Sequence, residues 1–226
     1  MQVVILAGGL GSRLSEETKI VPKALVKIGK KPIIVHLINY YQSFGYNDFI
    51  ICLGYKGNLI NEFFLKEKHK NYFKRTKIKL INTGKKSYTG ERIKRIKKYI
   101  TGDFFLTYCD GLSNINLNKT LKLFKKSKKI GLVSAINPKS RFGVLSIDKK
   151  NNVLNFDEKS KSSNTWINAG FFIFTKKIFK FIGGKNSIFE KSPLINLSKK
   201  KQLIAYKHKG FWQCMDTLKD KIVLDK

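Results

Sequence analysis

One stretch near the N-terminus constrains the fold more than any other part of the chain. It spans Val3 to Lys23 and has the sequence VVILAGGLGSRLSEETKIVPK. Its first four residues are apolar and mostly β-branched, which predicts a short buried strand. Three glycines in the next five residues, Gly8, Gly9 and Gly11, allow the backbone to turn sharply and to present its N–H groups to another molecule. A strand that ends in such a loop is typical of a sheet that binds phosphate.

The residues after the loop complete a candidate anion site. Arg13 offers a forked cation and Lys23 a point charge, so both can supplement the amides of the loop. A dinucleotide-binding G-x-G-x-x-G loop would need a third glycine where this chain has Leu14, and the Gly-Lys-Ser/Thr ending of a P-loop is missing. The alternative is an ordinary glycine-rich turn with two exposed cations.

The pattern downstream predicts an α/β fold. Apolar residues recur at helical spacing from Ile33 to Tyr41, the run 48–53 is a predicted strand, and a second helix follows around residues 59–64. Further strands are predicted at 78–81 and 103–108, with a helix at 91–100 between them. This alternation favours a parallel sheet covered on both faces. The second half of the chain has more strands and loops, and Pro193 is expected to break a helix there.

Length and composition favour a single folded unit. A chain of 226 residues without repeats or flexible linkers predicts one domain, 1–226, with lobes at about 1–130 and 131–226. No apolar run reaches the ~20 residues that a membrane helix needs. The three cysteines are odd in number and far apart, which favours a reduced, cytoplasmic protein over a disulfide framework or a zinc site.

The net charge of +31 raises the alternative of a nucleic-acid-binding protein. Only five of the 46 basic residues are arginines, although base readout and bidentate phosphate contacts favour arginine. The lysines are spread along the whole chain. We therefore interpret the charge as a solvated lysine coat, which disfavours a nucleic-acid partner but would concentrate anionic substrates.

Two further sites stand out in the chain. Asp110 follows the predicted strand 103–108, and ligands bind at the carboxyl ends of strands in an open parallel sheet. A carboxylate there, among cations and phosphates, is suited to hold Mg²⁺, although a turn aspartate is the simpler alternative. Arg92 lies early in a helix that follows the polar loop ending in Thr89 and Gly90, where an anion would offset its unfavourable position. It could equally be one of several solvated cations.

Taken together, these motifs resemble the sugar-1-phosphate nucleotidyltransferase superfamily, and within it the glucose-1-phosphate cytidylyltransferases. The resemblance covers nearly the whole chain. It rests on LAGGLGSRLSEET, PK at 22–23, DFIICLGYKG, the TG-x-R-x-KR segment at 89–95, RFG at 141–143, EK at 158–159, INAGFF at 167–172 and GFWQCMDTLKDK near the end. It implies a Rossmann-like, mostly parallel mixed sheet flanked by helices, with a smaller strand-and-loop lobe for the sugar.

The resemblance also implies a reaction and a set of roles. A sugar-1-phosphate oxygen would attack the α-phosphorus of CTP in line, releasing pyrophosphate and forming CDP-glucose from glucose-1-phosphate. Arg13, Lys23 and Asp110 would be catalytic, and Asp110 and Asp216 would bind Mg²⁺. The implied nucleotide contacts are Leu6, Ala7, Gly8, Gly9, Gly11, Ser12, Arg13, Lys23, Thr89, Gly90, Arg92 and Asp110, and the sugar-phosphate contacts are Gly143, Glu158, Lys159, Asn168 and Gly170.

Other interpretations stay open from the sequence alone. A protein of the same fold could use another nucleotide or another phosphorylated acceptor for surface-glycan synthesis. Glu158 and Lys159 could form a surface ion pair, and Asn168 could cap a turn. A silent regulatory homologue would have no need to keep Arg13, Lys23, Asp110 and Asp216 together. The family resemblance also implies a homo-oligomer, although the segment 65–79 is shorter here than the family pattern leads us to expect.

Overall fold

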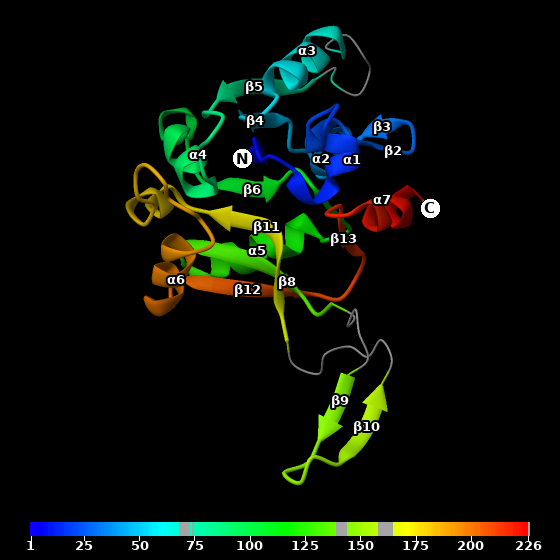
Figure 1. Ribbon diagram of the computed structural model, residues 1–226. Helices are drawn as coiled ribbons and strands as arrows, with labels where there is room; N and C mark the ends of the chain where they lie inside the picture. Colours follow the sequence, from blue (N-terminus) through cyan, green and yellow to red (C-terminus); the bar gives the residue numbers. More distant parts are fainter. Residues whose placement is uncertain (68–72, 74, 139–143, 158–164, 226) are drawn as a thin grey trace.

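A computed structural model describes residues 1–67, 73, 75–138, 144–157 and 165–225 of the chain. Its centre is a seven-stranded sheet with the order β12-β8-β11-β6-β1-β4-β5 (Figure 1). All neighbouring pairs are parallel except those of β11, which runs antiparallel to both β6 and β8. The mostly parallel mixed sheet expected from the sequence is therefore confirmed.

The strands of this sheet are short and regular. Their bounds are β1 Gln2–Ala7, β4 Asp48–Leu53, β5 Lys77–Asn82, β6 Phe104–Tyr108, β8 Gly131–Ile136, β11 Ile167–Phe174 and β12 Leu203–His208. The predicted strand 48–53 has the bounds expected. Because β1 lies between β6 and β4, the glycine-rich loop leaves the sheet near its middle, at the carboxyl ends of the parallel strands.

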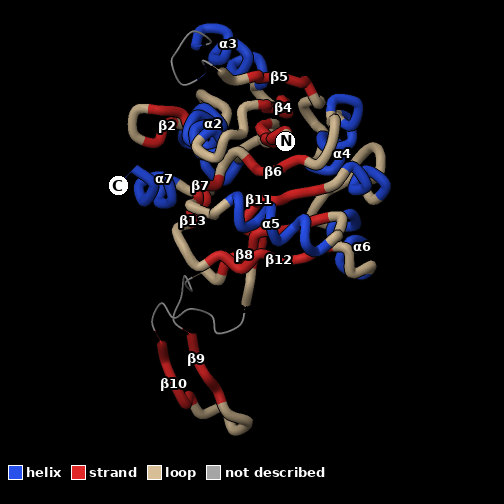
Figure 2. The backbone as a smooth tube through the Cα atoms, turned by 180° about the vertical axis from the view of Figure 1, so that it is seen from behind, coloured by secondary structure: helices blue, strands red, loops and turns tan. Residues whose placement is uncertain are grey.

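Alternate side chains of β1 enter different cores. Val3 and Ile5 pack with the helices α2 (Ile33–Gln42), α3 (Gly57–Glu67) and α5 (Leu117–Ser127) on one face. Val4 and Leu6 pack with α4 (Thr89–Arg95), the 3₁₀ turn η5 (Lys176–Lys180) and α6 (Ser192–Lys199) on the other. Figure 2 shows α5 crossing in front of the sheet, whereas in Figure 1 it lies behind. A strand buried on both faces needs the unbroken apolar run that opens the sequence.

In the described part of the chain, three small strand pairs lie outside the main sheet. The strands β2 (Lys27–Ile28) and β3 (Lys31–Pro32) form a tight hairpin, and β7 (Gly111–Ser113) pairs antiparallel with β13 (Trp212–Cys214). The third pair, β9 (Val144–Ile147) and β10 (Val153–Asp157), projects away from the body of the molecule in both Figure 1 and Figure 2.

Several local predictions differ from the structure. The helix expected at 91–100 begins at Thr89 and ends at Arg95, and a separate 3₁₀ turn, η4 (Lys97–Tyr99), follows it. Pro193 does not break a helix. It lies in the first turn of α6, where the missing N–H has no intrahelical partner to lose. The strands β7 and β13 were not predicted, because three residues carry no measurable periodicity.

Candidate functional site

The glycine-rich loop joins the end of β1 to two short helical turns, η1 (Ser12–Leu14) and α1 (Ser15–Thr18). Leu6, Ala7 and Gly8 are buried, whereas Gly9 and Ser12 are exposed. Gly11 has a φ of +69°, so its left-handed backbone suits glycine, and its carbonyl accepts hydrogen bonds from the Leu14 N–H and the Thr18 hydroxyl. The loop thus turns back at once and exposes only its central residues.

Lys23 joins two carboxylates from opposite halves of the chain. Its Nζ lies 2.6 Å from Oδ2 of Asp110 and 2.8 Å from Oδ1 of Asp216. All three side chains are largely buried, with exposed fractions of 12%, 27% and 19%. The sequence pattern singled out Lys23 and Asp110, and the family resemblance added Asp216 as a partner of Asp110. The structure places all three together at the carboxyl end of β6, beside the glycine-rich loop.

The pairing of β7 with β13 creates this convergence. Cys214 lies opposite Gly111, and the Met215 N–H donates to the Asp110 carbonyl at 2.7 Å. The backbone next to one carboxylate is therefore bonded to the backbone next to the other. Met215 itself is fully buried in a small core beneath the loop, with Leu14 among its neighbours. The packing of this core helps to hold in place the backbone that carries both aspartates.

A capping box holds the second carboxylate in place. The Asp220 carboxylate accepts from the backbone N–H groups of Asp216 and Thr217, while the Asp220 N–H donates to the Thr217 hydroxyl. This arrangement starts the last helix, α7 (Leu218–Asp225). Sequence reasoning missed Asp220, although the T-x-x-D spacing from Thr217 was a signal that could have found it.

The charge balance of this cluster favours a cation at its centre. Burial would lower the pKa of Lys23, but the two carboxylates, Asp110 above all, outweigh burial and raise that pKa above its usual value. Lys23 is therefore an ammonium at neutral pH. Two carboxylates that converge on one positive charge are also the type of donor set that Mg²⁺ takes, since Mg²⁺ typically binds one or two carboxylates together with substrate phosphates and water.

The segment before and within α4 is engaged with other parts of the protein. The Thr89 hydroxyl donates to Glu190 at 2.6 Å and accepts from the Phe189 N–H. Gly90 is buried, and a Cβ there would lie 2.5 Å from the Ser187 hydroxyl oxygen. Arg92 is only 4% exposed and does not reach solvent. In this structure these three predicted nucleotide contacts make contacts within the protein.

The side of β11 nearest Asp110 carries two of the predicted sugar-phosphate contacts. Asn168 is exposed, and its side-chain oxygen accepts from the Gly170 N–H at 2.8 Å. Gly170 has a φ of +80°, and a Cβ there would lie 2.7 Å from the Tyr108 ring. The Tyr108 hydroxyl in turn donates to Glu190. Tyr108 and Glu190 therefore link the regions of Asn168 and Thr89, and neither residue type carried a sequence signal.

Part of the predicted site lies outside the described residues. Gly143, Glu158 and Lys159 belong to the segments 139–143 and 158–164, and residues 68–72 and 74 of the shortened segment 65–79 also fall outside the description. For Arg13 the structure describes the backbone, which lies in η1.

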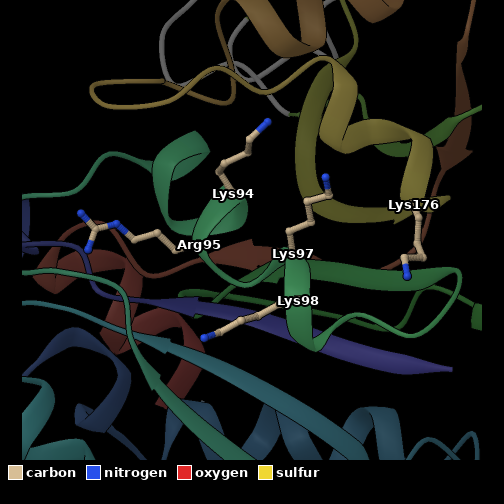
Figure 3. A pocket seen from close by; sticks show the side chains of 5 residues that line it. All are labelled: Lys94, Arg95, Lys97, Lys98 and Lys176. Atoms are coloured by element: carbon tan, nitrogen blue, oxygen red, sulfur yellow. The ribbon is translucent and has the colours of Figure 1, made fainter.

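A second group of cations lies at the other end of β6 from Asp110. Lys94, Arg95, Lys97, Lys98 and Lys176 line an open depression of about 500 Å³ (Figure 3). Phe174, just before η5, pairs with Phe104 at the start of β6, so this depression lies at the amino end of β6. Arg95 points away from Lys97 and Lys176 (Figure 3) and is paired with Glu91, while Lys94 donates to two backbone carbonyls. The depression is separate from the Asp110 site.

The comparison with protein families decides the class of this protein. The nucleotidyl transferase family model matches residues 2–218, which is nearly the whole chain. The chain belongs to the nucleotidyl transferase family. The glycine-rich loop and the Lys23–Asp110–Asp216 cluster thus lie within the matched region of a nucleotidyltransferase.

Individual relatives indicate which members of the family this chain is similar to. This nucleotidyltransferase is 39% identical to the glucose-1-phosphate cytidylyltransferase of Salmonella typhimurium, over 100% of this chain and 95% of the relative. It is 38% identical, with the same coverage, to the probable glucose-1-phosphate cytidylyltransferase of Bacillus subtilis. Another relative, the D-glycero-alpha-D-manno-heptose 1-phosphate guanylyltransferase of Campylobacter jejuni, is 32% identical over 79% of this chain and 78% of its own length.

Solved structures share the fold of this nucleotidyltransferase. HddC from Yersinia pseudotuberculosis matches with a TM-score of 0.76 and 27% identity, over 99% of this chain and 97% of that one. A UDP-glucose pyrophosphorylase complexed with UDP-glucose matches with a TM-score of 0.76 at 20% identity, over 99% of this chain and 96% of that one, which supports the fold alone.

Proposed function

We propose that this nucleotidyltransferase makes CDP-glucose and pyrophosphate from CTP and glucose-1-phosphate. The observation that carries the proposal is the 38–39% identity, over the full chain, to relatives named glucose-1-phosphate cytidylyltransferase. The 32% identity to the guanylyltransferase of Campylobacter jejuni supports a second candidate function, that of a same-fold enzyme that uses another nucleotide or sugar phosphate.

The proposed chemistry depends on positioning and on charge neutralisation. The sugar-phosphate oxygen attacks the α-phosphorus in line while the bond to pyrophosphate breaks, so no covalent enzyme intermediate is needed. The exposed amides of the glycine-rich loop bind the phosphates, and Arg13 neutralises the β and γ phosphates. Lys23 meets the α-phosphate, where negative charge builds in the transition state.

Asp110 and Asp216 are the residues that would hold Mg²⁺, which neutralises phosphate charge when it is bound. Their carboxylates accept from the Lys23 ammonium in the structure, at 2.6 and 2.8 Å, so one cation position between them is already defined. The Lys23 ammonium has three N–H donors and gives two of them to the aspartates, so one is left for the α-phosphate. The aspartates thus have two roles in the proposal: they orient Lys23, and they would hold the metal when it is bound.

The acceptor side of the proposal depends on β11 and the segments around it. Glu158 accepts hydrogen bonds from sugar hydroxyls, and Lys159 neutralises the sugar phosphate. Gly143, Asn168 and Gly170 line the sugar pocket. The bulge of β11 between Asn168 and Phe172 supports this assignment, because it interrupts the ladder with β8 beside the Asp110 end of β6.

The chain is proposed to act as one two-lobed domain, 1–226, in a homo-oligomer in the cytoplasm. The exposed apolar face of the β9–β10 hairpin supports self-association, since Leu145, Ile147, Val153 and Phe156 are 48–62% exposed. None of the helices in the described part of the chain is long and apolar enough to cross a membrane.

Replacing Lys23 or Asp110 with alanine tests the assigned roles. Each variant should lose turnover of CTP and glucose-1-phosphate to pyrophosphate while its far-ultraviolet circular dichroism stays unchanged. Full turnover in both variants would contradict the catalytic assignment, even if the wild-type reaction is as proposed.

A further inference from the structure

A buried arginine holds the base of the glycine-rich loop. Arg92 extends from α4, and its Nη2 donates to the Gly8 carbonyl at 2.8 Å. Its Nη1 donates to the Leu53 carbonyl at 3.1 Å, the Thr83 hydroxyl at 2.9 Å and the Gly84 carbonyl at 2.7 Å. These acceptors lie at the carboxyl ends of β1, β4 and β5, which are three neighbouring strands of the sheet.

The oxygens that accept from this guanidinium are neutral carbonyl and hydroxyl groups. Among the ion pairs of the described residues, Arg92 is joined to no carboxylate, and its helix neighbour Glu91 is paired with Arg95 at 2.7 Å. A buried cation without a charged partner is costly, so its four oxygen acceptors have to offset the loss of water. The positive charge of Arg92 therefore remains directly behind the loop.

Two glycines make room for this arginine. A Cβ at Gly8 or at Gly54 would overlap the Arg92 guanidinium. The requirement for glycine at position 8 thus comes from inside the protein, whereas at Gly9 a Cβ would meet nothing within 4 Å. The loop and the arginine fit each other as one unit.

Because the peptide bond is planar, the contact of Arg92 with the Gly8 carbonyl also affects the direction of the Gly9 N–H. The Gly8 carbonyl and the Gly9 N–H belong to one planar trans peptide, so they point in opposite directions. The Gly8 carbonyl accepts from Arg92 and, at 3.2 Å, from the Tyr55 N–H, and both donors hold it toward the interior. The Gly9 N–H therefore points away from Arg92, and Gly9 is exposed. Arg92, the charged and closer of the two donors, thus helps to set the direction of one of the loop's donors while it stays buried itself.

We propose that Arg92 is a positioning residue, which aims the Gly9 N–H at a nucleotide phosphate and adds a positive charge behind the loop. This inference rests on the proposed function for the identity of the nucleotide. It replaces the direct nucleotide contact that the sequence suggested for Arg92 with an action through the Gly8–Gly9 peptide.

The test compares Arg92→Met and Arg92→Lys with the control Arg95→Met, which removes one positive charge from the exposed end of the same helix. Arg92→Met should raise the KM for CTP about tenfold or more, and change the KM for glucose-1-phosphate less than about twofold. Millimolar guanidinium should partly restore the KM for CTP in this variant. Arg95→Met should leave both constants within about twofold.

Arg92→Lys keeps the charge but loses the fork that bridges three strand ends, so it should retain the fold and still raise the KM for CTP. A folded Arg92→Met or Arg92→Lys enzyme with an unchanged KM for CTP would overturn the proposal, as would an equal rise in both KM values. If the wild type uses another nucleotide, the same variants measured with that nucleotide separate the failure of the proposed function from the failure of this inference.

Discussion

Lys23 carries more of the proposed chemistry than any other single side chain. Its Nζ is bonded to both candidate metal ligands, and it opposes negative charge at the α-phosphate in the transition state. The loss of one such preorganised group typically slows an enzyme about 100- to 1,000-fold. Lys23→Met should therefore reduce kcat by at least that factor, measured as pyrophosphate release.

The same variant makes a second prediction that does not depend on turnover. Without the ammonium, the carboxylates of Asp110 and Asp216 lose the cation that now lies between them. Mg²⁺ should therefore bind more tightly to Lys23→Met than to the wild type in calorimetric titrations without nucleotide. Asp216→Asn provides the matched control and should bind Mg²⁺ more weakly. Equal Mg²⁺ affinity in all three proteins would show that the metal does not bind between these aspartates.

At the scale of elements, the buried thiols make the central strands sensitive to alkaline pH. Burial raises the pKa of Cys52 on β4 to about 12, and that of Cys109, just after β6, also to about 12. Because these pKa values are higher in the folded chain than in the unfolded chain, the folded chain keeps protons that the unfolded chain loses. The stability that results is complete below about pH 9 and falls as the pH rises toward 12.

The thiol of Cys52 can be tested through the melting temperature. The wild type should melt at a lower temperature at about pH 10.5 than at about pH 8, and Cys52→Ala should show a smaller difference between the two. Cys214→Ala serves as the comparison at a partly exposed position, where the pKa of the thiol is raised less, to about 11, so its effect should be smaller than that of Cys52→Ala. An identical pH dependence in wild type and Cys52→Ala would mean that this thiol contributes nothing to it.

The β9–β10 hairpin projects from the body of the molecule. The paired residues Leu145 and Phe156, and Ile147 and Val153, lie on one apolar face, and a two-stranded hairpin alone is marginally stable in water. If this face joins copies of the chain, Phe156→Ser should shift the molar mass in light scattering toward the monomer, whereas Leu154→Ser, at the bulge, should shift it less. An unchanged mass in Phe156→Ser would assign self-association to another surface.

The elements also show what the sequence alone can predict. The apolar run before Gly8 and the run 48–53 identify buried strands, because each must satisfy two cores at once. Asp110 could be placed at a strand end because it closely follows another such run, 103–108. The pairing of β7 with β13, which brings Asp216 to Asp110, depends on contacts between residues about a hundred positions apart and left no local pattern. The role of Arg92 was hidden because a helical arginine usually faces solvent.

At the scale of the whole molecule, the net charge of +31 should affect the rate of substrate capture. A positive surface attracts an anionic nucleotide over a distance that salt shortens. The value of kcat/KM for CTP should therefore fall steeply between low and physiological salt, with kcat nearly unchanged. A kcat/KM that is independent of salt would show that the lysine coat does not steer the substrate.

The central claim is the identity of the two substrates. The measurement that tests it most directly is pyrophosphate release with Mg²⁺ and glucose-1-phosphate, carried out separately with CTP, ATP, GTP, UTP and dTTP. The account predicts release with CTP far above the other four, and CDP-glucose as the product. Release that is faster with another nucleotide, or no release with any of the five, would contradict it.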